Sequence, residues 1–193
     1  EYRGGLEAAL NAGWKILEKG GSSLDAVEAS VCLLEDFPLF NAGRGAVFTH
    51  EGNVELDAAI MDGYKLKAGA VAFVKNIRNP VKLARLVMER TEHVLLAGDG
   101  ANQFAESMHV RAEPDEYFFT EHRWLQLQDA LAAGRIQLDH SDIVDKSITD
   151  SLEGGFTPAP VADAASGGKP PFQTVSNKLE DDNRALGTVG AVA

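Results

Sequence analysis

The sequence lacks the features of a disulfide-rich, secreted or membrane-spanning protein. Cys32 is its only cysteine, so no disulfide can form within the chain. No apolar run approaches the roughly 18 residues that a membrane-spanning helix needs, and we expect no secretory signal from the first residues. We therefore expect a cytoplasmic protein with no membrane partner. Cys32 lies among apolar helix positions and is expected to be a buried structural thiol.

Positive charge is also scarce. Only 18 Lys and Arg residues stand against 29 Asp and Glu residues, which gives a formal net charge of -11. Nucleic acids and anionic membranes are bound through clustered Lys and Arg, so we expect neither as a partner. Hydrophobic residues make up 45% and charged residues 24% of the 193 residues, which suits one soluble domain with a buried core.

Several motifs of other chemistries are missing or incomplete. Neither Gly43-Arg44-Gly45 nor Gly98-Asp99-Gly100 continues to the third glycine of a dinucleotide-binding loop. Gly167-Gly168-Lys169 leads into Pro170, where a phosphate loop needs Ser or Thr. The five histidines form no H-E-x-x-H pair and have no cysteine partners, which argues against zinc. No G-x-S-x-G elbow anchors Ser-His-Asp chemistry.

Apolar residues at helical spacing predict five helices in the first part of the chain. They are expected over 6–19, from Ser23 to before Pro38, over 80–90, over 101–108 and over 120–133. Ser22 or Ser23 offers an N-cap oxygen to the second helix. The first helix is expected to pack through a stripe made of Leu6, Leu10, Gly13, Trp14 and Leu17, and the last through Trp124, Leu127 and Leu131.

Shorter patterns predict strands between these helices. We expect a hairpin with a strand over 46–49, a turn over 50–53 and a returning strand from Val54. Apolar runs over 68–74 and 94–97 predict buried strands, the first of them covered on both faces. Two or three layers of helix and sheet follow from this alternation.

Two carboxylates stand two residues apart in the returning strand. Glu55 and Asp57 are expected to share one face of that strand. A pair of this kind suits acid–base catalysis, as in glycosidases. A solvated strand face or a turn network is the simpler explanation, and we favour it.

A segment rich in proline and glycine follows Asp139. Four of the seven prolines fall between Glu153 and Gln173, without hydrophobic periodicity. Such a composition is typical of an exposed linker that proteases attack. Residues 186–193 then become apolar and small again, as in a buried strand. A linker that leads directly into a core strand needs an explanation.

Gly187-Thr188 offers that explanation. Threonine becomes a useful nucleophile when a base accepts its proton, and the α-amine of an N-terminal threonine, with an ordinary pKa near 7.7–8.0, is such a base. To free this amine, the Thr188 hydroxyl attacks the Gly187 carbonyl, the acyl group moves from nitrogen to oxygen, and water releases the ester. Glycine tolerates the strained backbone of this step. From these residues alone, a β-branched residue in a strand of small residues remains the simpler interpretation.

Several sequence segments, taken together in their order along the chain, favour a nucleophilic Thr188 over the simpler interpretation. They are residues 39–49 (LFNAGRGAVFT), 55–63 (ELDAAIMDG), 66–72, 79–81, 84–89, 93–96 and 187–193 (GTVGAVA). The first resembles the asparagine-glycine loop, and the last the cleavage junction, of plant-type L-asparaginases and isoaspartyl aminopeptidases. These enzymes are N-terminal-nucleophile hydrolases of the threonine type. The resemblance covers roughly residues 6–140 and 186–193 and skips the linker.

The resemblance implies an α/β fold, a four-layer αββα sandwich, which this chain would form only in part. Residues 1–140 would be the α-subunit-like portion, 141–187 a linker ending at the autocleavage site, and 188–193 the truncated first strand of the β-subunit. Autocleavage between Gly187 and Thr188 would make Thr188 the nucleophile, positioned with the help of Asn41. Its substrates would be L-asparagine or isoaspartyl dipeptides, and α- and β-subunits would assemble as (αβ)2.

The resemblance further implies that the chemistry requires no cofactor, while a structural sodium or potassium ion suits the family. Backbone carbonyls would hold this cation, here those of Glu35, Asp36, Phe37, Phe40, Ala42 and Arg44. The family's opening strand with its His-Gly-Gly motif has no counterpart before Glu1, and its substrate-gripping residues and oxyanion donors come after Ala193. We therefore expect this chain by itself to be inactive.

Other functions remain open at this point. Within the same superfamily, a glycosylasparaginase or a threonine endopeptidase would use the same nucleophile. An alternative from a different functional class is a non-catalytic fragment that acts only through a partner chain, because incomplete sheets leave edges open to pairing.

Overall fold

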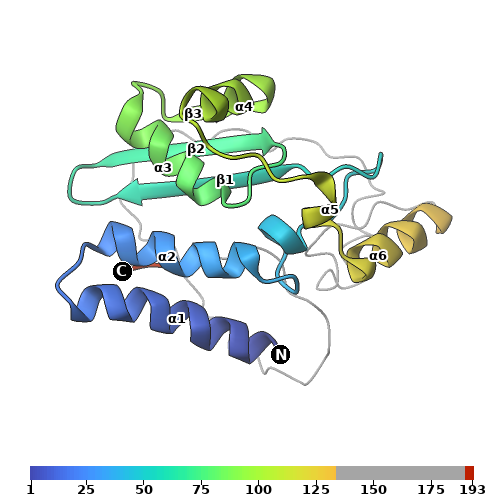
Figure 1. Cartoon of the computed structure of the whole chain (residues 1–193), viewed down its shortest axis with the longest axis horizontal. Coiled ribbons are helices and arrows are strands. Elements are labelled where there is room, and N and C mark those ends of the chain that lie inside the picture. Colours follow the sequence, from blue (N-terminus) through green and yellow to red (C-terminus); the bar gives the residue numbers. More distant parts are fainter. Residues whose placement is uncertain (134–189) are drawn as a thin grey trace, which may run out of the picture. The chain divides into compact units, whose positions relative to one another are not determined.

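The computed structural model describes residues 1–133 and 190–193, which all belong to one structural unit. Figure 1 shows its helices and strands. They are α1 (Tyr2–Glu18), α2 (Ser23–Asp36), the short 3-10 helix η1 (Gly43–Gly45), β1 (Leu56–Asp62), β2 (Lys67–Val74), α3 (Pro80–Arg90), β3 (Leu95–Ala97), α4 (Gly98–Ser107), α5 (Asp115–Phe118) and α6 (Glu121–Ala132). The predicted linker and Thr188 lie outside the described residues. Within those residues, no helix is both long and apolar enough to cross a membrane.

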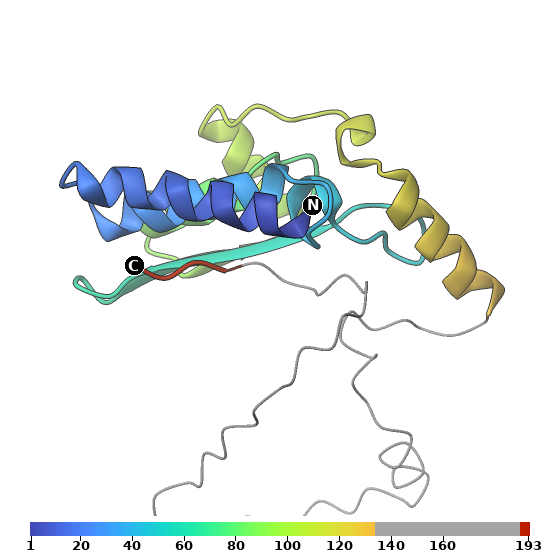
Figure 2. The same cartoon turned by 90° about the horizontal axis from the view of Figure 1, so that it is seen from below.

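The three strands form one sheet in the order β1-β2-β3. β1 runs antiparallel to β2, and β2 runs parallel to β3. The crossover helix α3 packs so closely on this sheet that a side chain at Gly69 would clash with the Ala84 carbonyl. Figure 2 shows the sheet edge-on, with α1 to α4 on one of its faces. The described residues therefore form one helical layer on one sheet, an α/β arrangement consistent with part of an αββα sandwich.

The main core lies between the sheet and the helices α2, α3 and α4. Its innermost residues are fully buried: Val74, Leu83, Ala84, Val87 and Ala101. The opposite face of the sheet is more open among the described residues. Met61 is 59% and Leu95 is 55% exposed. The prediction of a buried strand over 94–97 is therefore wrong for the described structure. The 68–74 strand, predicted to be covered on both faces, is covered by helices on one face alone.

Helix α1 packs on α2 through small residues. Gly5, Ala9 and Gly13 are its buried positions. The hydroxyl of Ser30 donates to the Ala9 carbonyl at 2.9 Å, and an added Cβ at Gly13 would clash with this hydroxyl. Of the predicted packing stripe only Gly13 is correct, because close approach of two helices favours small side chains. Its large members are at least 38% exposed: Leu6, Leu10, Trp14 and Leu17.

The predicted hairpin between residues 46 and 54 is correct only in its turn, where the Thr49 amide donates to the Asn53 carbonyl at 2.7 Å. Residues 46–49 form no strand in the structure. The Val47 amide donates to the Asn41 side chain at 2.9 Å, and the Phe48 ring packs on the Trp124 ring. The strand that begins at Leu56 pairs with β2 instead. β1 and β2 are consecutive strands joined by residues 63–66, so the hairpin lies one strand later in the chain than predicted.

Candidate active site

A groove of about 1020 Å³ borders β1. Its walls come from α2, from the loop between α2 and β1, from β1 and β2, and from residues 190–193. Asn41 is part of this lining. The predicted nucleophile-positioning residue and the residues that follow Thr188 in the chain therefore line the same groove. Residues 190–193 carry no strand assignment in the described structure.

Tight backbone packing shapes the loop that carries Asn41. Gly43 has a φ of +49°, a conformation that disfavours residues with a Cβ. A side chain at Gly43 would also clash with the Glu35 carbonyl, and one at Gly45 would clash with the Phe40 carbonyl. The two glycines are therefore required where the loop folds back on the end of α2. This packing fixes the place of Asn41 at the groove.

Glu35, at the end of α2, connects this loop to α3. It is only 2% exposed, and its Oε1 accepts a hydrogen bond from the Val81 amide at 3.0 Å. It thereby caps the N-terminus of α3, a task that the Asn79 side chain does not perform. Its Oε2 has no hydrogen-bond partner among the described residues. Burial raises the pKa of the Glu35 carboxyl to about 8.

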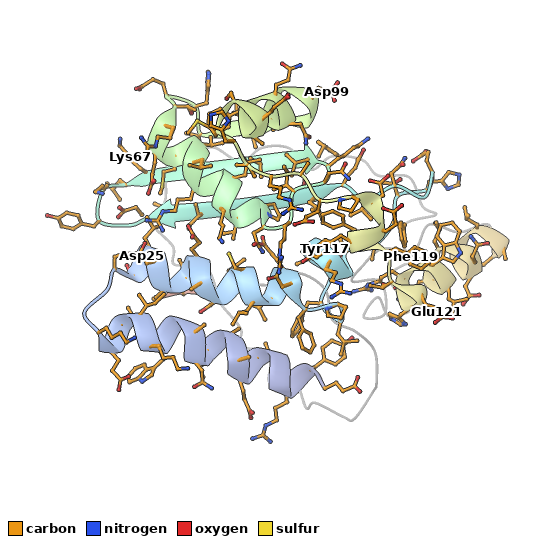
Figure 3. The ribbon with its side chains drawn as sticks, in the orientation of Figure 1. Asp25, Lys67, Asp99, Tyr117, Phe119 and Glu121 are labelled. Atoms are coloured by element: carbon orange, nitrogen blue, oxygen red, sulfur yellow. The ribbon has the colours of Figure 1, made fainter. Side chains whose placement is uncertain are left out.

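Asp36 is hydrogen-bonded to Arg78 and to Tyr117, which lies on α5. The Arg78 guanidinium donates to both of its carboxylate oxygens at 3.0 Å, and the Tyr117 hydroxyl donates to Oδ1 at 3.0 Å. Burial alone would raise the pKa of Asp36, but these hydrogen bonds outweigh it and hold the pKa below its usual value. The Arg44 and Arg78 guanidinium groups lie 5.6 and 5.3 Å from the Tyr117 ring centroid. Figure 3 shows Tyr117 next to η1.

The remaining predicted cation-binding residues lie on the same loop. Among them, the carbonyls of Phe37, Phe40 and Ala42 each accept one backbone hydrogen bond, at 2.9–3.3 Å. A carbonyl oxygen has a second lone pair, so these oxygens retain capacity for a ligand. Among the described residues, no three His, Cys, Asp or Glu side chains gather into a metal site. Oxygen donors of this kind suit a hard cation.

The other candidate side chains have structural partners. Glu55 pairs with the Lys75 ammonium at 3.1 Å, and Asp57 accepts from the Phe73 amide at 2.8 Å, where the β1–β2 register shifts. These contacts agree with the favoured interpretation of a solvated strand face or a turn network, although Glu55 precedes β1 and both residues also line the groove. Cys32 is half-buried against the core, and burial raises the pKa of its thiol to about 12. The prediction of a structural thiol is thus met, although its burial is incomplete.

Arg123 is a residue near the site that sequence reasoning missed. It lies on α6, is only 3% exposed, and its Nε donates to the Gly45 carbonyl at 2.7 Å. The apolar pattern of α6 had pointed to Trp124 and Leu131 as packing residues, yet these are 37% and 42% exposed. No periodicity marks a buried arginine, so a contact 78 residues away in the chain was not predictable.

The fold and groove suit a hydrolase of the N-terminal-nucleophile class, and the chain matches the asparaginase family over residues 1–193. The chain belongs to this family. It is 52% identical over 140 residues to the isoaspartyl peptidase of Salmonella typhimurium, covering 72% of this chain and 45% of that protein. It is 49% identical over 136 residues to the plant-type L-asparaginase of Pyrococcus horikoshii, covering 69% and 43% respectively.

A vertebrate relative shows the same likeness. The isoaspartyl peptidase/L-asparaginase of Xenopus laevis is 48% identical over 128 residues, covering 65% of this chain and 41% of that protein. The chain thus spans less than half the length of these curated relatives. The resemblance drawn from the sequence motifs is confirmed. Gly187 and Thr188 lie outside the described residues.

Proposed function

We propose that the complete protein hydrolyses the side-chain amide of L-asparagine, the β-linked bond of isoaspartyl dipeptides, or both. Cleavage after Gly187 would free the α-amine of Thr188, which then accepts the proton of its own hydroxyl. The hydroxyl oxygen attacks the amide carbonyl, ammonia or the amino component leaves with a proton, and water hydrolyses the acyl-enzyme to release aspartate. Relatives named isoaspartyl peptidase and L-asparaginase support this substrate range.

One observation carries the proposal: Asn41 and residues 190–193 line the same groove. Thr188 precedes Gly190 by two residues in the sequence. Asn41 Oδ1 accepts a hydrogen bond from the Val47 amide at 2.9 Å, which orients the side-chain amide. In this proposal Asn41 helps to position the nucleophile and the loop to be cleaved.

The open sheet face supports a second proposal about assembly. Helices cover one face of the β1-β2-β3 sheet among the described residues (Figure 2). A β-subunit that begins at Thr188 would supply a second sheet for the other face and complete a four-layer αββα sandwich. Pairs of such units would form (αβ)2. The single cysteine agrees with a cytoplasmic location, which we propose with the rest.

A sodium or potassium ion on the loop after α2 is the remaining proposal. The backbone carbonyls of residues 35–37, 40, 42 and 44 would hold the ion. Its role would be to stiffen the Asn41 loop, and the chemistry would need no cofactor. Replacing sodium and potassium by tetramethylammonium should lower the melting temperature of the protein. No change in melting temperature would argue against the ion.

The activity is tested on the complete gene product with two substrates. Ammonia release from L-asparagine and leucine release from β-aspartyl-leucine are measured at neutral pH. Asn41→Ala should lower kcat by about 100-fold, the scale typical of a lost polar group that acts on the reacting centre. Asn53→Ala is the matched control, because Asn53 lies exposed in the next turn and does not line the groove.

The alternative functions predict different outcomes. Release of aspartate from glycosylated asparagine, without activity on the two substrates above, would indicate a glycosylasparaginase. Cleavage of longer peptides by Thr188 would indicate an endopeptidase. Absence of all these activities in the complete protein would contradict the proposal and favour a non-catalytic role through a partner chain.

A further inference from the structure

A buried arginine holds the segment that follows Asn41. Arg123 is only 3% exposed, and its Nε donates to the Gly45 carbonyl at 2.7 Å. Its guanidinium also donates to Gln126 Oε1 at 2.9 Å, within the same helix. A buried guanidinium is costly unless hydrogen bonds satisfy it, and a charged donor makes a hydrogen bond about twice as strong as a neutral one. The contact between Arg123 and Gly45 is therefore a strong link between α6 and the Asn41 loop.

The loop transmits this link to the Asn41 amide. Gly45 lies two residues before Val47, whose amide donates to Asn41 Oδ1 at 2.9 Å. Moving the Gly45 carbonyl would move Val47 and so withdraw the N–H donor that orients the Asn41 side-chain amide. Because a side chain at Gly45 would clash with the Phe40 carbonyl, the backbone has little room for another arrangement. The orientation of Asn41 thus depends on the position of Gly45.

An aromatic cluster fixes the same segment one residue further on. The Phe48 ring lies 5.5 Å from the Trp124 ring and 6.1 Å from the Phe119 ring, measured between centroids. Figure 3 places Phe119 and Glu121 at the start of α6. The Thr120 hydroxyl caps α6 by accepting from the Arg123 amide at 3.3 Å. The start of α6 therefore contacts residues 45–48 at two points, through the hydrogen bond to the Gly45 carbonyl and through the ring contacts of Phe48.

We propose that Arg123 is a positioning residue for the reaction, holding the Gly45 carbonyl so that the Asn41 amide stays in place at the groove. The inference rests on the proposed function of Asn41. In this proposal Arg123 does not touch the substrate and acts on Asn41 through Gly45 and Val47. A displacement of about 1 Å at a positioning group costs on the order of 100-fold in rate. Loss of the contact should therefore lower kcat and leave KM nearly unchanged.

The test uses the complete gene product with four variants. Arg123→Lys keeps the charge but loses the directed Nε–H donor. Arg90→Lys is the matched control, on an exposed arginine at the end of α3. Asn41→Ala and the double variant with Arg123→Lys complete a double-mutant cycle. The measurements are kcat and KM with L-asparagine and β-aspartyl-leucine, and hydrogen exchange of the Val47 amide.

We expect Arg123→Lys to lower kcat by about 10- to 100-fold, with KM within about threefold of the wild-type value. The Val47 amide should exchange faster, and Arg90→Lys should match the wild type. In the Asn41→Ala background, Arg123→Lys should cost less than about twofold more, because its target is already absent. Unchanged kcat and Val47 exchange, a rise in KM alone, or multiplied losses in the double variant would each overturn the inference.

If Arg123→Lys fails to fold, a milder variant still tests the inference. Gln126→Ala removes the acceptor of the second Arg123 hydrogen bond. It should loosen the guanidinium, lower kcat by about threefold or more, and speed Val47 exchange; unchanged values of both would overturn the inference. The wild-type protein reports separately on the proposed function. If it hydrolyses neither substrate, that function fails, while Val47 exchange in the variants still decides whether Arg123 holds the loop.

Discussion

Glu35 shows how one buried side chain joins three parts of the molecule. It ends α2, lies against Gly43 of the Asn41 loop, and caps α3 through the Val81 amide. Its type gave no hint of this role, because glutamate is rarely buried without a partner. Asn79 occupies the N-cap position of α3, but its side chain does not cap the helix. Its amide instead donates to the Cys32 carbonyl and to Asp36.

The raised pKa of Glu35 predicts a pH dependence of stability. In the folded protein the carboxyl keeps its proton up to about pH 8, whereas the unfolded value is 4.5. Between these values unfolding releases a proton, so the free energy of unfolding falls as pH rises from 4.5 to 8 and levels above it. Glu35→Gln should flatten this slope in urea titrations made without sodium or potassium. Glu92→Gln, at an exposed position, should retain it. An unchanged slope in Glu35→Gln would refute this assignment.

At the scale of helices and strands, local sequence signals predicted where an element begins and ends better than which of its faces packs against the core. Ser22 accepts from the Asp25 amide at 3.1 Å, and α2 ends two residues before Pro38, so this helix was predicted closely. Capping and proline geometry act within a few residues and can be seen in the sequence. The packing face of α1 depends on which segment arrives from elsewhere in the chain. Periodicity of large apolar residues marked the wrong stripe of α1.

Two glycines of α1 test the small-residue contact. Gly13→Ala places a Cβ against the Ser30 hydroxyl and the Ala26 carbonyl, and should lower the free energy of unfolding by about 1–3 kcal/mol. Gly4→Ala, in the same helix, meets no atom within 4 Å. It should raise the free energy of unfolding by up to about 1 kcal/mol, since alanine favours helix. Urea titrations of both variants measure the difference. Equal effects would show that α1 does not pack on α2 through Gly13.

At the scale of the whole molecule, the site is assembled from distant segments. The groove brings together the loop around Asn41 and residues 190–193, about 150 positions apart in the sequence. Single residues did not reveal this arrangement, since Gly-Thr pairs and asparagines are common. Ordered motifs over most of the chain made Asn41 and Thr188 candidates through resemblance. The hydrogen bond from Arg123 had no motif, and only the folded arrangement shows it.

The central claim is that Thr188 becomes an N-terminal nucleophile, and intact-mass analysis tests it most directly. The complete gene product is purified, incubated at neutral pH and weighed over time, beside a Thr188→Ala variant. We predict that a species beginning at Thr188 accumulates together with its complement ending at Gly187, that hydrolysis appears in step with it, and that the variant stays intact and inactive. An uncleaved wild-type protein that hydrolyses asparagine at full rate, or a Thr188→Ala variant that is cleaved at the same bond, would contradict the account.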